Sequence, residues 1–399
     1  MSILSIETLG KEDLEGKRVL MRVDFNVPIV GGVISDDTRI KAALPSIKYL
    51  LDRGAALILM SHLGRPSGIG FEAEYSMKPV ADHLAHILSE NPVKYVNEVS
   101  GPLVQAQADA LNPHEILVIE NLRFDTGEKA GNEDFAKELS ELADIYVNDA
   151  FGTAHRNHAS VSKIAKYLPA YAGLLMDKEL SNLGALLTED KQPFYAVLGG
   201  SKVSDKVGII SALSKKCQKI LIGGAMCFTF LKAQGFEVAN SLVEDDWLER
   251  VEGIISDAKQ SGSEIILPID FVCASEFSES ADTYISEDQN IKEGYMGLDI
   301  GPKTVELFAH ELKDARLVFW NGPMGVFEME SFSHGTKGIA ETLAKLNAVY
   351  TVIGGGDSVS AVHKFNLGDK FDFISTGGGA SMQLLEGKTL PGVAALDKE

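Results

Sequence analysis

Short apolar segments of strand length recur along the whole chain, and nearly every one is followed at once by glycine or a polar residue. These segments, rich in Val and Ile, span residues 19–25, 55–60, 116–119, 145–147, 194–198, 219–222, 265–271, 317–320, 350–353 and 371–375. Amphipathic stretches that are typical of helices lie between them, at residues 38–53, 79–90, 132–143 and 202–216. Strands that alternate with helices predict an α/β fold with parallel sheets wound on both faces.

The residues that end the strands predict where ligands bind. In open α/β sheets, ligands bind beyond the carboxyl ends of the strands. Polar or glycine-rich groups follow the strands in both halves of the chain, for example at residues 62–65 and 199–202. We therefore expect one site in each half.

The length of 399 residues suits two domains of about 200 residues better than one core. Residues 173–188 carry apolar positions at helical spacing, and the break Lys191-Gln192-Pro193 follows them. We predict two doubly wound parallel-sheet domains joined by a hinge helix. The predicted N-terminal domain is 1–185 and the C-terminal domain is 186–386, with a tail at 387–399.

The formal charge of −20 argues against binding of nucleic acid or an anionic membrane surface, because the average field repels polyanions. No apolar run approaches the roughly 18 residues that span a bilayer, and the first ten residues lack a secretory pattern. The three cysteines form no CxxC pair, which indicates neither a disulfide framework nor a zinc site. We expect a cytoplasmic protein without nucleic-acid or membrane partners.

Arginine and glycine are distributed unequally between the halves. Seven of the nine arginines precede residue 160, whereas glycine clusters fall mostly later, at 199–200, 223–224, 354–356 and 377–379. Guanidinium groups suit bidentate capture of small phosphates and carboxylates, and glycines let backbone N–H groups approach a nucleotide's phosphates. The two halves are predicted to bind different anions.

The common nucleotide motifs are absent. Residues 386–389 read like the end of a Walker A loop, but Met382 stands where its first glycine is required. The first strand is followed by no GxGxxG, and no HxD catalytic loop occurs. The missing dinucleotide pattern counts against a two-domain dehydrogenase, which is one alternative.

Nine motifs occur in order over essentially the whole chain. They are residues 22–28, 37–40, 61–66, 121–125 and 151–156 in the first half, and 199–206, 320–328, 354–358 and 375–379 in the second. In this ensemble the chain resembles phosphoglycerate kinase. The resemblance implies reversible phosphoryl transfer between 1,3-bisphosphoglycerate and ADP, giving 3-phosphoglycerate and ATP, by a monomeric glycolytic enzyme. It also implies that the tail packs back on the first domain.

The resemblance implies a triose site in the first half. Its residues are Asp24, Phe25, Asn26, Arg39, His62, Leu63, Gly64, Arg65, Arg123 and Arg156. Three arginines and a histidine can neutralise a phosphate dianion, and Asp24 with Asn26 can bond a substrate hydroxyl. A single arginine forms a surface ion pair about as often as it binds a ligand. Several arginines just past strand ends favour a binding site.

The resemblance implies a nucleotide site in the second half. Its residues are Lys206, Asn321, Glu328, Gly354, Gly355, Gly356, Asp357 and Ser358. Lys202 and Lys206 are spaced i, i+4 at a predicted helix start, which would place both on one face. Glu328 would accept bonds from ribose hydroxyls. Asp357 either caps the next helix or serves the nucleotide's Mg²⁺, directly or through water, and we favour the second role.

The expected chemistry needs no general base, because the acceptor carboxylate is already ionised at neutral pH. Arg39, Lys202, Mg²⁺ and the N–H groups at Gly355-Gly356 and Gly377-Gly378 are the candidates for stabilising the transferring phosphoryl group. Reactants on separate domains imply closure of the hinge. A binding protein that keeps the fold without the chemistry is the other alternative, and it predicts damage to Lys202, Arg39 or Asp357, all of which are intact.

Overall fold

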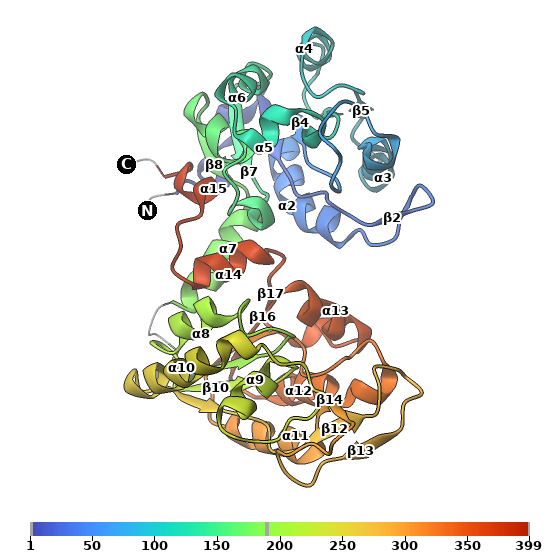
Figure 1. The fold of residues 1–399 in the computed structure, drawn as a ribbon. Coiled ribbons are helices and arrows are strands. Elements are labelled where there is room, and N and C mark those ends of the chain that lie inside the picture. Colours follow the sequence, from blue (N-terminus) through green and yellow to red (C-terminus); the bar gives the residue numbers. More distant parts are fainter. Residues whose placement is uncertain (1–2, 188–190, 398–399) are drawn as a thin grey trace. The chain divides into compact units, whose positions relative to one another are not determined.

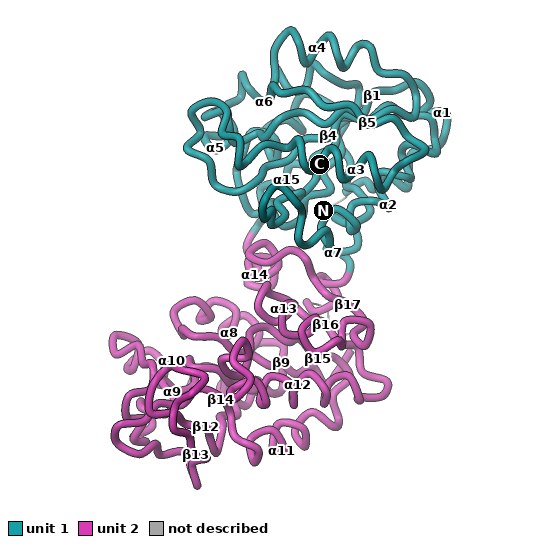
Figure 2. Tube along the Cα trace, turned by 90° about the vertical axis from the view of Figure 1, so that its right-hand side faces the viewer, with its two compact units in different colours: residues 1–181, 389–399 teal, residues 182–388 magenta. Residues whose placement is uncertain are grey.

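The computed structural model describes residues 3–187 and 191–397. The chain divides into two compact units, Met1–Ser181 with Thr389–Glu399 (unit 1) and Asn182–Lys388 (unit 2), drawn in two colours in Figure 2. Helix α7 (Leu174–Ala185) carries the chain from the first unit into the second. Thr188 of the predicted connecting helix and residues 398–399 of the predicted tail lie outside the described residues.

Unit 1 contains a six-stranded sheet in the order β5-β6-β4-β1-β7-β8, and every pair is parallel. The strands are β1 (Arg18–Arg22), β4 (Ala56–Met60), β5 (Val93–Tyr95), β6 (Ile116–Val118), β7 (Ile145–Asn148) and β8 (Ala170–Ala172). The longer helices are α2 (Thr38–Asp52), α3 (Lys78–Ile87), α4 (Pro102–Asp109) and α6 (Glu133–Ser140). Short helices are α1 (Lys11–Leu14), α5 (Thr126–Ala130) and α15 (Pro391–Ala394), and β2 (Ile29–Val30) pairs with β3 (Val33–Ile34).

Unit 2 contains a second six-stranded parallel sheet, in the order β11-β10-β9-β15-β16-β17. Its strands are β9 (Phe194–Leu198), β10 (Lys219–Ile222), β11 (Glu264–Ile266), β15 (Leu317–Asn321), β16 (Tyr350–Gly354) and β17 (Phe373–Ile374). A small antiparallel sheet joins β12 (Phe271–Ala274), β13 (Thr283–Ile285) and β14 (Met296–Ile300). The helices are α8 (Val207–Leu213), α9 (Met226–Ala233), α10 (Leu248–Gln260), α11 (Pro302–Glu311), α12 (His334–Lys345), α13 (Gly356–Lys364) and α14 (Gly379–Leu385), as Figure 1 shows.

Both parallel sheets are buried on both faces, as continuous apolar strands require. In unit 1, Met21 and Leu59 point to one face and pack in a core with Ile47 of α2 and Leu84 of α3. Their strand neighbours Leu20 and Ile58 point to the opposite face and are equally buried. The prediction of doubly wound parallel-sheet domains is therefore confirmed.

Two predicted elements differ in the structure. The apolar run at 265–271 forms the end of β11 and the start of β12, which belong to different sheets, and Pro268 lies between them where a ladder N–H would be needed. The helix predicted at 202–216 begins only at Val207. Among the described residues, every helix is too short or too polar to cross a membrane.

Candidate active site

The predicted triose residues of unit 1 follow four neighbouring strands of its sheet. Asp24 and Asn26 follow β1, His62 follows β4, Arg123 follows β6 within a 3-10 turn, and Arg156 follows β7. Because these strands are parallel and adjacent, their carboxyl ends meet at one edge of the sheet. The chain also crosses there from one side of β1 to the other, between β6 and β7, which makes this edge the topological switch point.

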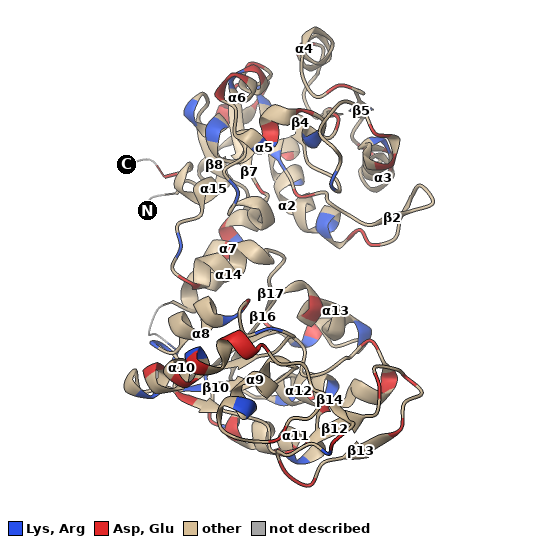
Figure 3. Cartoon of the chain, viewed as in Figure 1, with Lys and Arg blue, Asp and Glu red and all other residues tan. Residues whose placement is uncertain are grey.

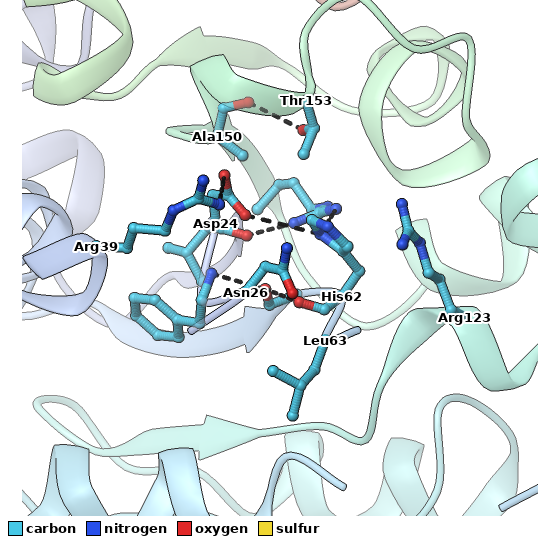
Figure 4. A network of polar contacts seen from close by, with 12 residues as sticks. Asp24, Asn26, Arg39, His62, Leu63, Arg123, Ala150 and Thr153 are labelled. Atoms are coloured by element: carbon cyan, nitrogen blue, oxygen red, sulfur yellow. Dashed lines mark hydrogen bonds and ion pairs between the residues drawn. The ribbon is translucent and has the colours of Figure 1, made fainter. Parts of the chain in front are cut away.

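Asp24 lies in the middle of this cluster, as Figure 4 shows. Its Oδ2 accepts a hydrogen bond from Nη1 of Arg39 at 2.8 Å. Its Oδ1 is buried and has no hydrogen-bond partner among the described residues, with Nδ1 of His62 at 3.8 Å. A buried acceptor without a partner is costly, so Oδ1 is suited to accept a bond from a ligand hydroxyl.

Asn26 and Arg123 each use part of their hydrogen-bonding capacity on the loop after β4. Oδ1 of Asn26 accepts the N–H of Gly64 at 2.8 Å, which leaves its amide N–H₂ as a donor. Nη1 of Arg123 donates to the carbonyl of Gly64 at 2.6 Å, whereas its buried Nε has no partner among the described residues. Both side chains therefore keep donors for a ligand.

The guanidinium groups of this cluster repel one another. Burial lowers the pKa of Arg123, and the positive charges of Arg156 and Arg22 lower it further. Arginine stays protonated at neutral pH, so the repulsion persists until an anion enters. The electrostatics of this edge favour a phosphate or carboxylate ligand.

The surroundings of His62 disfavour its charged form. Burial, followed by the charges of Arg22, Arg123 and Arg39, lowers its pKa well below the ordinary value. This shift favours the neutral imidazole, and the expectation that a histidine helps to neutralise a phosphate dianion stays a prediction. In its neutral form the His62 ring can still contribute a hydrogen bond.

Two of the predicted triose residues are core residues. The side chains of Phe25 and Leu63 belong to the apolar core of unit 1. Their backbone groups are also committed, since Phe25 donates its N–H to Ser61 and Leu63 exchanges two bonds with the amide of Asn121. These residues shape the loops, whereas Arg65 and Arg156 are exposed at the same edge.

Unit 2 has a cavity of about 500 Å³ at its own switch point. The chain runs from β9 through β10 to β11 on one side of the sheet and then crosses to β15 on the other. The cavity is lined by residues that follow these strands, among them Gly200 and Pro323, and by apolar side chains such as Phe277 and Leu298. An apolar cavity with polar groups at one end suits a nucleotide.

A network of polar groups joins the carboxyl ends of β15 and β16 to the start of α8. Nζ of Lys206 donates to Oδ1 of Asn321, whose Nδ2 donates to the carbonyl of Gly354 at 2.7 Å. Oγ of Ser358 accepts the N–H of Gly322 at 2.6 Å. Asn321 and Ser358 are fully buried, so they brace the loops and hold Lys206. Burial lowers the pKa of Lys206, although the charges of Asp357 and Asp205 oppose that shift.

The helical pairing expected for Lys202 and Lys206 is wrong. Lys206 is the N-cap of α8, and Lys202 lies in the preceding loop. Ser204 in this loop donates its N–H and its hydroxyl to the carboxylate of Glu244, at 3.0 and 2.6 Å. These bonds hold the loop outside the helix, and Lys202 is exposed while Lys206 is half-buried.

Gly355 and Asp357 stand at the start of α13. Gly355 is its N-cap with φ of 90°, and a Cβ there would lie 2.6 Å from Nδ2 of Asn321, so only glycine fits. Among the described residues, no side chain caps the start of α13. The Asp357 carboxylate is exposed in the first turn and lines the cavity together with Glu328. Gly378, with φ of 51°, is the N-cap of α14 in the same way.

The Asp357 carboxylate fits the donor set of Mg²⁺, which takes hard oxygen ligands and usually only one or two carboxylates beside phosphate oxygens. Within residues 3–187 and 191–397, no group of three or more His, Cys, Asp or Glu side chains could hold a metal by itself. A cation at Asp357 would therefore depend on the nucleotide for its other ligands. Figure 3 shows that acidic residues are otherwise spread over both units.

Some residues at these sites were not predicted as ligands. Arg22, at the end of β1, is buried beside His62. Its place in a strand did not indicate that it would contact a site residue. Leu242 and Phe277 of the cavity wall do not follow parallel strands, so the search for residues at strand ends missed them. Their exposure despite large apolar side chains becomes visible only in the structure.

Comparisons with known proteins agree on one family. The family model "Phosphoglycerate kinase" matches residues 9–388. A phosphoglycerate kinase of Prochlorococcus marinus (strain MIT 9211) is 52% identical over 402 residues and covers 100% of both chains. One of Thermosipho africanus (strain TCF52B) is 51% identical over 392 residues, covering 98% of this chain and 97% of that protein.

Solved structures of phosphoglycerate kinases are similar over the whole length. The structure from Coxiella burnetii matches with a TM-score of 0.89 at 38% identity, covering 99% of each chain. The structure from Pyrococcus horikoshii OT3 matches with a TM-score of 0.84 at 30% identity, covering 99% of this chain and 98% of that one.

Proposed function

This chain belongs to the phosphoglycerate kinase family, and we propose that unit 1 binds the phosphoglycerate and unit 2 the nucleotide. The enzyme is a phosphotransferase with a carboxyl group as acceptor, and it acts in glycolysis and gluconeogenesis. It transfers a phosphoryl group reversibly between 1,3-bisphosphoglycerate and ADP, giving 3-phosphoglycerate and ATP. Both alternatives from the sequence, the dehydrogenase and the binding protein, are thereby set aside.

The observation that carries the proposal for unit 1 is the environment of Asp24. Its buried Oδ1, which has no partner within the described part of the chain, lies among cationic side chains, and Arg39 is bonded to the other oxygen. A ligand with both a hydroxyl and an anionic group satisfies this environment, and 3-phosphoglycerate has a hydroxyl between a carboxylate and a phosphate. Asn26, Arg65, Arg123 and Arg156 would bind its anionic groups as donors.

The cavity of unit 2 supports the nucleotide proposal. Its apolar wall suits a purine base, and Glu328 at its rim would accept bonds from ribose hydroxyls. Lys206, half-buried and held by Asn321, would meet the phosphates. Gly354, Gly355 and Gly356 would bring backbone N–H groups close to the phosphates at the start of α13.

The reaction needs alignment and charge stabilisation rather than proton transfer. The carboxylate of 3-phosphoglycerate, with a pKa near 3.5 for such groups, is already a nucleophile at neutral pH. A carboxylate oxygen forms the new bond to the γ-phosphorus, the bond from phosphorus to the β-phosphate oxygen breaks, and ADP leaves with that electron pair. No proton has to be removed from the acceptor.

We assign charge stabilisation at the transferring phosphoryl group to Arg39, Lys202 and the N–H groups at Gly355 and Gly378. Mg²⁺, when bound with the nucleotide near Asp357, supplies further neutralisation of phosphate charge. Arg39 belongs to unit 1 and Lys202 to unit 2, so this assignment needs a contribution from each unit. We further propose that the protein is a monomer in the cytoplasm.

A coupled assay tests the proposal directly. Purified protein should form ATP from 1,3-bisphosphoglycerate and ADP, and the rate should depend on added Mg²⁺. Calorimetry with 3-phosphoglycerate should show binding that Arg123→Ala abolishes while ADP still binds. Loss of ADP binding with intact 3-phosphoglycerate binding in that variant would reverse the division of ligands between the units.

A further inference from the structure

A buried chain of four side chains lies behind the triose site in unit 1. Oε1 of Glu128 accepts the hydroxyl of Ser160 at 2.7 Å, and Oε2 accepts the Ser160 N–H at 3.0 Å. Oγ of Ser160 in turn accepts Nε–H of Arg22 at 2.9 Å. Nη2 of Arg22 lies 3.2 Å from Nδ1 of His62. Glu128 and Ser160 are 0% exposed, Arg22 is 1% and His62 is 6% exposed.

The direction of the last bond in this chain is fixed by chemistry. A guanidinium group has donors only, so Nδ1 of His62 must accept from Arg22. The neutral imidazole then carries its single proton on Nε2. Within the described residues, Nε2 of His62 has no hydrogen-bond partner. The chain therefore presents one N–H donor, at Nε2, that is not used inside the protein.

Ser160 is held by each of its polar groups. It lies in a π-helical turn, Ala159–Lys163, a wide turn that is frequent at functional sites. Its carbonyl accepts the hydroxyl of Tyr146 at 2.8 Å, while its N–H and hydroxyl donate to Glu128. The hydroxyl oxygen is thus fixed as the acceptor for Arg22. Because every hydrogen-bonding group of Ser160 is in use, its hydroxyl is held in one place and fixes the position of the Arg22 side chain.

Glu128 supplies the charge that lets Arg22 stay buried. Although burial raises the pKa of Glu128, contact with His158 (Nδ1 to Oε1 3.6 Å), the charge of Arg22 and the bonds from Ser160 together lower it below its ordinary value. The carboxylate is therefore ionised and compensates the guanidinium. Without it, Arg22 would lose the buried carboxylate to which Ser160 links it.

We propose that Glu128 is a positioning residue for the phosphoglycerate, which acts through Ser160 and Arg22 to hold the His62 ring with its N–H on Nε2 directed to the substrate. The inference rests on the proposed assignment of this ligand to unit 1. Glu128 does not touch the substrate. It fixes the tautomer and orientation of a side chain that does.

Two variants and one control test the inference. Glu128→Gln removes the charge, and Ser160→Ala removes the link to Arg22 while keeping the backbone bonds to Glu128 and Tyr146. The control is Glu133→Gln on α6, an exposed carboxylate paired with Lys166. We expect both variants to raise KM for 3-phosphoglycerate by about 10-fold, with KM for ATP and kcat within about twofold. The control should match the wild type.

Nitrogen-15 NMR of the His62 ring gives a readout that purely structural damage would not produce. The wild type should show the proton on Nε2, and the two variants should show mixed tautomers or a charged ring. A folded Ser160→Ala protein with unchanged KM and tautomer overturns the inference, as does a raised KM with an unchanged ring. A wild type that forms no ATP would instead refute the assigned function, and the ring spectrum, which needs no turnover, still decides the tautomer.

Discussion

Oδ1 of Asp149, the residue directly after β7, lies 2.9 Å from the backbone nitrogen of Leu175 in the first turn of α7. The same oxygen accepts the N–H of Met176 at 3.1 Å. The carboxyl group is fully buried, and Oδ2 has no partner among the described residues. The loop that leads to Arg156 and the helix that leaves unit 1 are therefore joined through one buried side chain.

This arrangement predicts a pH-dependent stability. Burial, only partly offset by Ser46 and the two N–H groups, raises the pKa of Asp149 to about 7. The folded protein then binds more protons than the unfolded chain between about pH 4 and 7, so the free energy of unfolding falls as pH rises through that window. The contribution is fully present at low pH and lost above the folded pKa.

Asp149→Asn should remove this dependence, because the amide cannot ionise. The free energy of unfolding of the variant minus that of the wild type should be about 2–3 kcal/mol larger at pH 8 than at pH 5. Urea unfolding at both pH values measures the gain, with Asp134→Asn, an exposed carboxylate on α6, as the control. An equal difference between variant and wild type at both pH values would contradict the prediction.

Arg39→Ala should lower the activity of the enzyme without lowering its affinity for ADP. Arg39 belongs to unit 1 and is bonded to Asp24, but we assign it to the transferring phosphoryl group. We expect kcat to fall by about 10²- to 10³-fold, with the calorimetric Kd for ADP unchanged. Arg53→Ala, which removes an arginine that stacks on Tyr49, is the control. Weakened ADP binding at normal kcat would show that our division between the units is wrong.

Lys202→Ala should have a similar effect from the other unit. The side chain is exposed in a loop held by Ser204 and Glu244, so its removal should not disturb the fold. The loss of one cation near the phosphoryl group should lower kcat by about 10²- to 10³-fold. Lys215→Ala, another exposed lysine of unit 2, should keep full activity. Near-normal turnover in folded Lys202→Ala protein would refute the assignment.

The positions of most residues that we propose as ligands could be predicted from the sequence because they follow a local rule. Asp24, His62 and Arg123 come directly after apolar strands, and parallel strands bring their carboxyl ends together wherever they pair. The same rule located Asp357 after β16. A local pattern is sufficient here because the parallel pairing of the strands brings these residues together.

The residues that the sequence did not reveal depend on contacts over long separations. Arg22, Glu128 and Ser160 converge only because β1, α5 and a π-helical turn pack together, and no spacing along the chain encodes that meeting. Charged residues are rarely fully buried, so no feature of the sequence indicated that Arg22 would be buried. The helix predicted from residue 202 began later because Ser204 binds Glu244, again a tertiary contact.

Gly355→Ala should weaken nucleotide binding. The backbone at this N-cap has φ of 90°, and the new Cβ would meet Nδ2 of Asn321 at 2.6 Å. The clash displaces the amide that holds Lys206, so we expect the Kd for ADP to rise about 10-fold, with stability lower by about 1–2 kcal/mol. Gly253→Ala in α10, where a Cβ would meet no atom within 4 Å, should leave ADP binding unchanged. Equal Kd values for the two variants would contradict the assignment.

Phe277→Ala should weaken binding of the base. The side chain lines the cavity of unit 2 yet is 61% exposed, and large apolar side chains left exposed beside a cavity mark ligand sites. Stacking of a base on an aromatic ring is worth about 1–3 kcal/mol by alanine substitution, so the Kd for ADP should rise at least about fivefold. The Kd for inorganic tripolyphosphate, which has no base, should not change.

The matched control for Phe277 is Ile285→Ala. Ile285 is 54% exposed in β13 of the same antiparallel sheet region, but it does not line the cavity. Its removal costs a similar apolar surface without touching the nucleotide. If both variants weaken ADP binding equally, the effect is a general loss of packing in this region. If neither does, the base binds elsewhere and the wall of the cavity is not its site.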